Sequence, residues 1–456
     1  MKKYAWTHLN EQFVRELFTL LNAKQIKYFV LRNFEELPER NIGNDVDLVI
    51  EPGSYTRVKR IMLDLMRSME IRFYQIVQFD RMRCWYIMDN CKHFSIHIDF
   101  IENEVYKGFE FYDFDILYKN TKDYKFFKVL NNTFDIVMLL VQNLVAYKSL
   151  KQKYRDKISE NFEENKTQIK NEIISFWGEK CGNFVIENIK KGSFEEIVNN
   201  ANNLSNEAQK RIFLKKPLKT ICFIIRFLVG KFWRIVICPK SYRRFIAVEA
   251  PDGTGKTTFI EELIKELGFY YVCDDVRFCV HHFRPEKLPN LGAAREKMGV
   301  KKQDKDFTNP HRGRPVGFLS SLLRMTYYWV DYLLFMPIII RKEVQYGKYT
   351  IFDRYIYDFV VDPMRSRINL PKWLRQFFAH LVNKPQLVLV LDASPEIVIA
   401  RKQELELQEI KRQQIEFRNL KSINKNVVLI DANGSVDNEV EQAIKHIFDT
   451  FLEKAY

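Results

Sequence analysis

A glycine-rich loop that begins at Pro251 carries the residue types that hold phosphate groups. It reads PDGTGKTT, and it lies between the apolar run FIAVEA and the amphipathic run FIEELIKELG, so a strand before it and a helix after it are expected. Glycines let backbone N–H groups turn inward around phosphate oxygens, and the helix N-terminus faces the same charge. Lys256 is then placed to reach the β- and γ-phosphates, and Thr257 to ligate Mg²⁺. The residues expected around a nucleotide polyphosphate are Asp252, Gly253, Thr254, Gly255, Lys256, Thr257 and Thr258.

One position departs from the usual phosphate-loop pattern G-x-x-x-x-G-K-[ST]. Its first glycine is Ala250 in this chain. An alanine adds one methyl group, which the loop tolerates if that residue keeps a negative φ. A degenerate loop in a structural domain is the alternative interpretation, and the flanking strand and helix favour nucleotide binding over it.

A second candidate pair, Asp353 and Arg354, follows the apolar run YTIF. A carboxylate at the carboxyl end of a parallel strand lies where ligands bind in open α/β sheets, and it can hold Mg²⁺. Arg354 beside it is expected to clamp phosphates bidentately. An isolated Asp-Arg pair is more often a structural ion pair, but the phosphate loop upstream favours the catalytic interpretation.

Three carboxylates in the first hundred residues form another candidate group. Asp45 and Asp47 stand at i and i+2 on one expected strand, so both point to the same face of a sheet. Asp99 ends a further expected strand that can lie alongside. Three convergent carboxylates suit two Mg²⁺ ions and nucleotidyl transfer, although D-x-D pairs are also common on exposed strands.

The elements that position these residues indicate an α/β protein with more than one domain. At 456 residues the chain exceeds one ordinary core, so two or three domains are expected. Five short apolar runs after residue 244 alternate with helical stretches, which is typical of a parallel sheet with helices on both faces. These runs are FIAVEA, YYVCDD, YTIFDR, LVLVLDA and NVVLIDA.

The first half predicts an α/β unit with a mixed sheet. Residues 7–25 have helical spacing, and five strands are expected after them. The strand runs are YFVLRN, VDLVIE, IRFYQIVQFD, RCWYIMD and FSIHIDFIE. The predicted domains are an α/β domain at 1–130, a helical extension at 131–207, a basic amphipathic linker at 208–244 and a phosphate-loop domain at 245–456.

Positive charge is concentrated in that linker. The chain has 72 Lys and Arg against 58 Asp and Glu, a net charge of +14. Residues 210–244 contain eleven Lys or Arg and no acid, so taking +11 from +14 leaves +3 elsewhere. Basic residues within 218–238 disfavour a membrane-spanning helix. Their position opposite the apolar residues indicates either an in-plane helix on an anionic membrane or a linker helix packed on a neighbouring domain.

Charge and cysteine usage also narrow the expected partners and location. Outside the linker the charges nearly cancel, so no specific nucleic acid is expected as a partner. The seven cysteines are scattered and never form a C-x-x-C pair, which is typical of a reduced protein without a disulfide framework. No apolar run follows the lysines near residue 1, so a secretory signal is not expected. We expect a cytoplasmic protein, with the inner face of the membrane as the alternative place for a peripheral one.

Four segments of 245–456 resemble the thymidylate kinase family of phosphate-loop kinases. They are FIAVEAPDGTGKTT, IIIRKEVQYGKYTIFDRY, LVLVLDASPEIVIARK and NVVLIDANGSVDNEVEQAIKHI. The resemblance implies ATP as donor, Mg²⁺ as cofactor, and an acceptor held through its own phosphate by arginines. It also implies a catalytic set of Lys256, Asp353, Arg354 and Arg401. The candidate residues for the acceptor are Glu249, Arg284, Arg324 and Asp362, with His311 and Asp331 as further candidates.

Two departures from that family concern the acceptor. The segment after Arg401 is poor in arginine and short where the family has an arginine-rich lid. The stretch after Tyr355 carries Asp358, Asp362 and Arg365 in place of the expected motif. The acceptor therefore need not be dTMP.

Residues 25–102 resemble the nucleotidyltransferase superfamily through GNDVDL and HIDF. The family's Gly-Ser helix start is replaced by Leu31-Arg32-Asn33-Phe34. The combination is similar to thymidylate-kinase-like fusions associated with bacterial surface polysaccharides, an analogy that does not establish a substrate.

The leading hypothesis is ATP-dependent phosphoryl transfer to a nucleoside monophosphate or a related acceptor, with a second nucleotidyltransferase activity. A sugar or glycan kinase at the membrane surface is one alternative. The other is a nucleotide-dependent regulatory protein without turnover.

Overall fold

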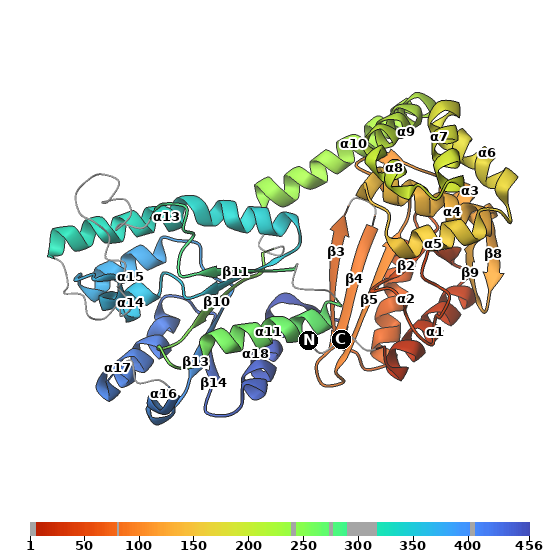
Figure 1. Ribbon diagram of the computed structural model, residues 1–456. Helices are drawn as coiled ribbons and strands as arrows, with labels where there is room; N and C mark the ends of the chain where they lie inside the picture. Colours follow the sequence, from red (N-terminus) through yellow and green to blue (C-terminus); the bar gives the residue numbers. More distant parts are fainter. Residues whose placement is uncertain (1–5, 80–81, 239–242, 273–276, 290–316, 402–405) are drawn as a thin grey trace. The chain divides into compact units, whose positions relative to one another are not determined.

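The structure is a computed structural model that describes residues 6–79, 82–238, 243–272, 277–289, 317–401 and 406–456. The described chain divides into two units between Lys231 and Phe232 (Figure 1). The amino-terminal unit runs to Lys231 and also includes Tyr270–Val272 and Lys454–Tyr456. The carboxy-terminal unit comprises the other described residues. The sequence predicts that the phosphate-loop domain begins at residue 245. The boundary between the two units lies earlier, inside the basic segment.

Five parallel strands form the sheet of the carboxy-terminal unit, in the order β11-β12-β10-β13-β14. The predicted parallel sheet is therefore confirmed. The chain leaves β10 for one side of the sheet and later crosses to the other side, so the strand order reverses at the central strand. The carboxyl end of such a strand is where open α/β sheets bind ligands. The strands are β10 (Phe245–Glu249), β11 (Phe278–His282), β12 (Tyr349–Asp353), β13 (Leu387–Asp392) and β14 (Val427–Asp431).

Helices cover both faces of this sheet, with α13 on one side and α11 and α18 on the other (Figure 1). Phe245 and Phe352 on the first face share a core with Tyr332 of α13. On the opposite face the ring of Phe451 in α18 lies against Tyr349. The helices are α11 (Lys256–Tyr270), α13 (Phe318–Gln345), α14 (Asp358–Val361), η6 (Pro363–Ser366), α15 (Lys372–His380), α16 (Pro395–Arg401), α17 (Leu407–Arg418), η7 (Asn419–Ser422) and α18 (Val436–Phe451).

The run YYVCDD is not the strand that the sequence predicts. Tyr270 is the last residue of α11, the next two residues form a turn, and the remainder of the run lies outside the described residues. Tyr271 packs within the amino-terminal unit, where its hydroxyl donates to Gln75 Oε1 at 2.9 Å. The second strand along the chain in this sheet is β11 instead, whose run FCVHH has only three apolar residues before two histidines and was not predicted as a strand.

The amino-terminal unit contains a mixed eight-stranded sheet in the order β15-β3-β4-β5-β2-β1-β9-β8. All five strands predicted before residue 103 are present, and α1 (His8–Ala23) confirms the first predicted helix. One face packs on α1 and on α2 (Tyr55–Ser68), where Phe13 and Met62 meet Trp85. The strands are β1 (Tyr28–Val30), β2 (Val46–Ile50), β3 (Phe73–Phe79), β4 (Met82–Asp89), β5 (Phe94–Ile101), β8 (Thr121–Tyr124), β9 (Phe127–Leu130) and β15 (Glu453–Lys454), with a separate ribbon of β6 (Val105–Tyr106) and β7 (Phe109–Glu110).

A bundle of short helices follows the sheet in the same unit. It has its own core, in which Trp177 is buried and donates from Nε1 to the Leu204 carbonyl at 3.1 Å. Part of this segment, Gln142–Tyr147, is a π-helix. The other helices of the bundle are α4 (Asn132–Val141), α5 (Gln152–Asn161), α6 (Lys166–Trp177), α7 (Glu179–Lys190), α8 (Phe194–Asn199) and α9 (Ala201–Lys215). The short helix α3 (Phe114–Lys119) comes earlier in the chain, between β7 and β8.

The basic segment folds as α10 (Pro217–Phe232), followed by the π-helix η2 (Trp233–Ile237). Within the described ranges, no helix combines the length and apolar content needed to cross a membrane. Gly108, in the turn between β6 and β7, approaches α10 so closely that a Cβ there would lie 2.6–2.7 Å from atoms of Ile224, backbone included. Its φ of +92° also favours glycine.

We predict that Gly108→Ala destabilises the amino-terminal unit more than Gly53→Ala does. Both glycines have a positive φ, which costs an alanine about 1 kcal/mol, but only Gly108 faces a backbone at that distance, whereas nothing lies within 4 Å of a Cβ at Gly53. Overpacking adds roughly 1–3 kcal/mol. Thermal unfolding should show the lower midpoint for Gly108→Ala, and equal midpoints would contradict the close approach of α10.

Candidate functional site

The loop after β10 surrounds a cavity of about 380 Å³. Gly253 and Gly255 have φ values of +87° and +95°, in the region that favours glycine, and α11 begins at Lys256. The lining consists of Pro251, all seven predicted phosphate-loop residues, Arg354 and Arg401. The structure therefore brings the predicted loop residues together around one hollow at a helix N-terminus, where anions are stabilised by the backbone N–H groups and the helix dipole.

Ala250, which replaces the usual first glycine, is compatible with this loop. It is buried, and it is not one of the non-glycine residues with positive φ in the described chain. Ala250 therefore has the negative φ that an alanine needs at this position.

Lys256, the first residue of α11, forms an ion pair with Asp353, the last residue of β12. The Lys256 ammonium contacts Asp353 Oδ1, and His282 Nδ1 lies 3.1 Å from Oδ2 of the same carboxylate. Burial alone would raise the pKa of Asp353, but the bond to His282 and the charge of Lys256 outweigh it and lower that pKa to about 2. Burial and the nearby Arg354 lower the pKa of Lys256. Asp353 is thus a carboxylate whose lowered pKa favours its ionised form, paired with Lys256.

Arg354 is held in a buried position between two carboxylates. Its Nη1 donates to both oxygens of Asp358, at 2.9 and 3.1 Å, and its Nη2 contacts Asp252. The residue has a φ of +69°, which is uncommon for a residue other than glycine. Arg354 lines the cavity, and its bonds to Asp358 fix the orientation of the guanidinium without a ligand.

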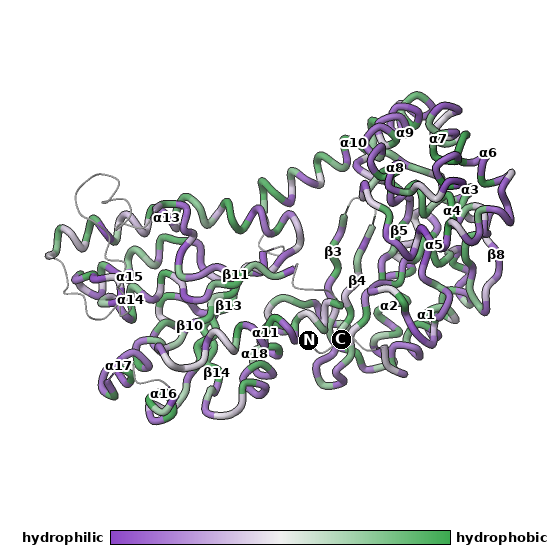
Figure 2. Tube along the Cα trace, viewed as in Figure 1, coloured by the Kyte–Doolittle hydropathy of each residue, from purple (hydrophilic) through white to green (hydrophobic). Residues whose placement is uncertain are grey.

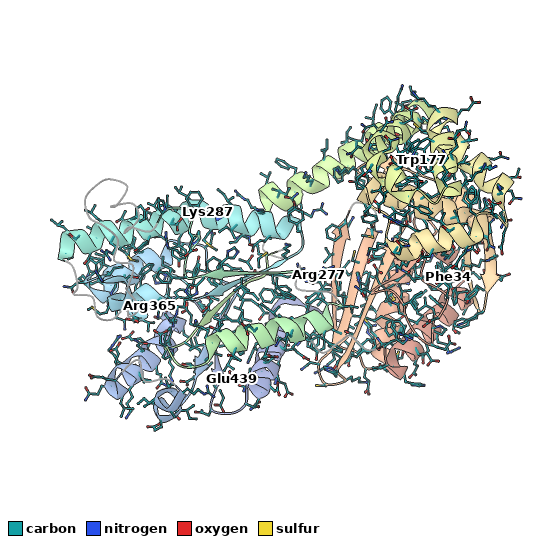
Figure 3. The ribbon with its side chains drawn as sticks, viewed as in Figure 1. Phe34, Trp177, Arg277, Lys287, Arg365 and Glu439 are labelled. Carbon is teal, nitrogen blue, oxygen red and sulfur yellow. The ribbon has the colours of Figure 1, made fainter. Side chains whose placement is uncertain are left out.

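Asp252 is bound by a second arginine that the sequence did not assign to the site. Arg365, labelled in Figure 3, donates from Nη1 to Asp252 Oδ2 at 2.7 Å. It lies in η6, over a hundred positions downstream, so no local pattern connects the two residues. Arg354 and Arg365 therefore hold Asp252 from two sides, and Arg354 pairs with Asp358 as well.

Glu249 lies beneath the loop with no exposed surface. Its Oε1 accepts from the backbone N–H of Tyr355 at 2.8 Å, and its Oε2 is buried without a hydrogen-bond partner in the described chain. Burial and the charge of Asp358 raise the pKa of Glu249 well above its usual value, against the opposing effect of Arg354. Through its bond to Tyr355, Glu249 joins the ends of β10 and β12, and the structure does not place it on a surface that an acceptor can touch.

The other predicted acceptor residues have partners inside the protein. Arg284 and Asp331 form a buried ion pair at 3.0 Å, and Arg324 donates to the Ser366 carbonyl at 3.0 Å. Asp362 is buried and accepts from the backbone N–H of Arg365 at 3.3 Å. None of these three predicted residues is in the lining of the loop cavity. His311 lies outside the described residues.

Arg401, at the end of α16, does join the loop. Its Nη1 donates to the Thr254 carbonyl at 2.8 Å, and it lines the cavity. A Cβ on Gly255 would lie 3.7 Å from the same nitrogen, an ordinary contact distance. This residue is therefore placed to neutralise charge on a phosphate held by the loop.

In the amino-terminal unit the three predicted carboxylates converge. β2 and β5 are parallel neighbours, and their register sets Asp47 opposite Asp99. Asp45, Asp47 and Asp99 each offer an oxygen, and these oxygens lie within 4.8 Å of one another. Asp45 is partly exposed and lines a pocket of about 390 Å³, whereas the other two are buried. Carboxylate oxygens at this spacing fit a hard divalent cation.

Arg32 occupies part of this carboxylate cluster. Its Nε and Nη2 donate to the two oxygens of Asp47, at 2.6 and 3.1 Å. Burial raises the pKa of Asp47 to about 7; Arg32 opposes this shift and Asp45 adds to it. The pocket beside the cluster also includes Lys151 and Lys153. A cation bound to all three carboxylates would have to displace Arg32 from at least one oxygen of Asp47.

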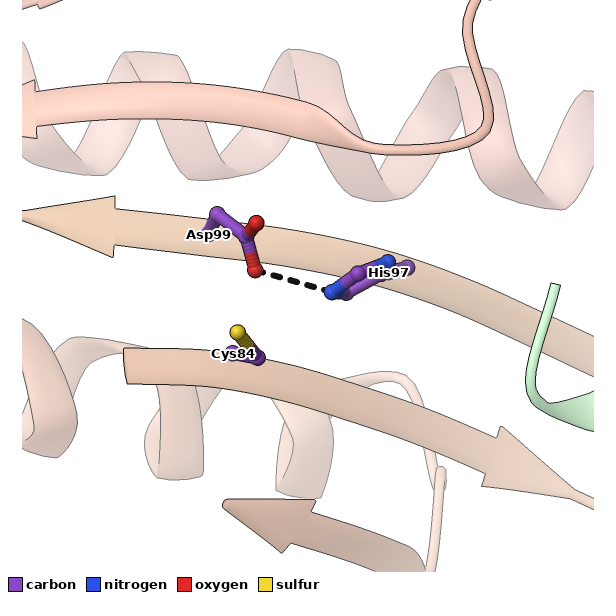
Figure 4. A group of neighbouring side chains, drawn as sticks. All are labelled: Cys84, His97 and Asp99. Atoms are coloured by element: carbon purple, nitrogen blue, oxygen red, sulfur yellow. Dashed lines mark ion pairs between the residues drawn. The ribbon is translucent and has the colours of Figure 1, made fainter. Parts of the chain in front are cut away.

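Asp99 belongs to a second group on the same sheet face (Figure 4). His97 Nε2 lies 2.8 Å from Asp99 Oδ1, and the sulfur of Cys84 is within 4.8 Å of both groups. Tyr86 stacks on the His97 ring with centroids 4.2 Å apart. These contacts hold the Asp99 carboxylate in place, as partners of metal-binding carboxylates commonly do.

No protein-family model matches the chain, and none of the curated proteins matches it. Two thymidylate kinases are among the solved structures similar to part of it. The enzyme from Ehrlichia chaffeensis is 17% identical with a TM-score of 0.30, and covers 44% of this chain and 96% of its own. The enzyme from Candida albicans is 17% identical with a TM-score of 0.33, and covers 45% of this chain and 91% of its own. Because both TM-scores are low, these similarities do not establish a function for the chain.

We predict that Gly255→Ala weakens nucleotide binding while Gly434→Ala does not. The Gly255 φ of +95° costs an alanine about 1–2 kcal/mol, so affinity for ATP should fall roughly 5- to 30-fold. Gly434 has ordinary contacts and lacks a positive φ. Calorimetric titration with Mg²⁺-ATP measures both variants. Equal affinities for Gly255→Ala and the unsubstituted protein would show that the loop does not bind phosphate in this conformation.

Proposed function

We propose that the carboxy-terminal unit transfers the γ-phosphoryl group of ATP to an acceptor of the nucleoside-monophosphate class, dTMP or a related compound. The observation that carries this proposal is the cavity at the carboxyl end of β10, enclosed by Asp252–Thr258 with Arg354 and Arg401. Backbone N–H groups at a helix N-terminus suit a polyphosphate. Lys256 and Asp353 supply the charges that phosphoryl transfer requires.

Each residue has a distinct part in this reaction. The loop amides and Lys256 bind the β- and γ-phosphates, and Arg401 neutralises charge that develops during transfer. Thr257, exposed at the first turn of α11, and Asp353 would hold Mg²⁺, which would neutralise negative charge on the phosphates. An acceptor oxygen forms a bond to the γ-phosphorus while the bond to the β-phosphate oxygen breaks, and ADP leaves. Positioning and charge stabilisation carry the catalysis.

Arg354 and Arg365 support an acceptor that itself carries a phosphate. Both contact Asp252 beside the loop, and Arg354 also pairs with Asp358. An acceptor phosphate can replace part of this contact without leaving a buried charge unpaired. A bidentate guanidinium favours phosphate over an uncharged hydroxyl acceptor. This is the reason to rank a nucleotide acceptor ahead of a neutral sugar.

We predict that Lys256→Ala lowers ATP-dependent turnover by roughly a hundredfold or more, because it removes the ammonium that compensates the transferred phosphate. The matched control is Lys265→Ala on the same helix, an exposed lysine paired with Glu262, which should change turnover little. ADP release with Mg²⁺-ATP and a panel of nucleoside monophosphates, sugars and sugar phosphates provides the assay. Unchanged turnover of Lys256→Ala would refute the proposed role.

The panel also separates the alternatives. Turnover with sugars alone would favour the glycan kinase, and tight ATP binding without turnover of any acceptor would favour the regulatory protein. Absence of ATP binding to the folded protein would remove the basis of all three.

A second candidate function, metal-dependent nucleotidyl transfer, is favoured by the convergence of Asp45, Asp47 and Asp99 beside a pocket. In that reaction an acceptor oxygen bonds to the α-phosphorus of a nucleoside triphosphate and pyrophosphate leaves. The carboxylates would hold divalent cations that assist attack and departure. The bond of Arg32 to Asp47 is the feature that such cations would have to displace.

We predict that Asp99→Asn lowers the affinity of the amino-terminal unit for Mn²⁺, a paramagnetic substitute for Mg²⁺, by about tenfold or more, because one of three converging charges is lost. Asp64→Asn removes an exposed acid from α2 and is the control. Paramagnetic resonance of the full chain, with Asp353→Asn in both variants to remove the carboxylate that the phosphate loop offers a cation, reports free Mn²⁺. The same affinity in both variants would argue against a cation site at the cluster.

A further inference from the structure

α10 carries a continuous apolar face that nothing in the described chain covers. Its members are exposed by 42–79%, and Figure 2 shows the helix as mainly hydrophobic. At about 100° per residue they lie within an arc of about 100°. The α10 apolar face consists of Leu218, Ile221, Ile225, Leu228 and Val229. Large apolar side chains collected on one exposed face mark an interaction surface.

The opposite side of α10 is attached to its own unit. Thr220 is 2% exposed, and Ile224 lies against Gly108. The Lys219 ammonium reaches Glu110 at 2.5 Å and Asp113 at 2.7 Å. These contacts fix the rotation of the helix, so the apolar face is held outward by the packing of its polar side and is not turned inward to the bundle.

Positive charges border the apolar face on both sides. Arg226 and Lys231 project about 110° from its centre in opposite directions around the helix, and residues 210–244 contain no Asp or Glu. An apolar strip with basic edges is the pattern of a helix that lies in the plane of a membrane interface. Cations beside the strip then meet the phosphates of anionic lipids.

We propose that the α10 apolar face binds a bilayer containing anionic lipid, with its axis parallel to the surface and with Arg226 and Lys231 at the headgroups. A second copy of the chain fits this face less well, because pairing two such faces would bring their basic borders together without any acid between them. A nucleic acid would match the charges and leave the apolar residues in water. The inference is independent of the reaction proposed for either unit.

The test is flotation of the full-length protein with vesicles of phosphatidylcholine, with and without phosphatidylglycerol. We expect binding mainly to the anionic vesicles. Ile225→Ser combined with Leu228→Ser should weaken it by about tenfold or more, since two large apolar side chains lose their contact with acyl chains. Arg226→Gln combined with Lys231→Gln should weaken it by roughly tenfold on anionic vesicles. Both pairs are exposed, so the fold should be retained.

A matched control removes the same kind of side chain from another exposed position. Leu319→Ser combined with Leu323→Ser on α13 replaces two leucines that are each 73% exposed, and it should bind vesicles as the unsubstituted protein does. Equal binding by the α10 apolar pair and this control would overturn the proposal. A dimer in gel filtration that only the α10 substitutions dissociate, with no flotation, would assign the face to a second copy and would also overturn it.

Discussion

A carboxylate removed from water costs several kcal/mol unless a cation or hydrogen-bond donors face it, and both candidate sites are built under that constraint. Lys256 faces Asp353 and Arg354 faces Asp358 in one unit. Arg32 faces Asp47 in the other. The groups that would hold phosphate or metal are already paired with opposite charges from the same chain. Ligand binding at either site is therefore an exchange of ionic partners.

This exchange explains why the two sites differ in what they can bind. Around the phosphate loop, the four cations Lys256, Arg354, Arg365 and Arg401 outnumber the three acids Asp252, Asp353 and Asp358, a balance that would suit an anion. At the carboxylate cluster three acids converge on the single guanidinium of Arg32, and Lys151 and Lys153 line the pocket beside them, so a cation there would have to replace Arg32. Asp353 and Asp99 also have histidine neighbours, which orient the carboxylates.

Much of the fold was predictable because short-range patterns carry it. The strands β1–β5, β10 and β12–β14 stand out as apolar runs, whereas β8, β9, β11 and β15 were not predicted. The phosphate loop and the D-x-D pair are local motifs. The run YYVCDD was misassigned, because a short apolar segment does not distinguish a strand from the end of α11. Arg32 and Arg365 were not predicted as site partners, since their contacts to Asp47 and Asp252 join residues far apart in the sequence.

The sequence by itself determined which chemical groups the protein possesses. It also determined where glycines let backbone N–H groups point toward a phosphate, because that conformation depends on residues adjacent in the chain. It also determined that α10 has an apolar side and a basic side. Only the tertiary structure decided that the predicted acceptor residues Arg284 and Arg324 have internal partners, and that the apolar side of α10 faces outward. Those outcomes depend on pairing and burial between distant segments, which local sequence patterns do not encode.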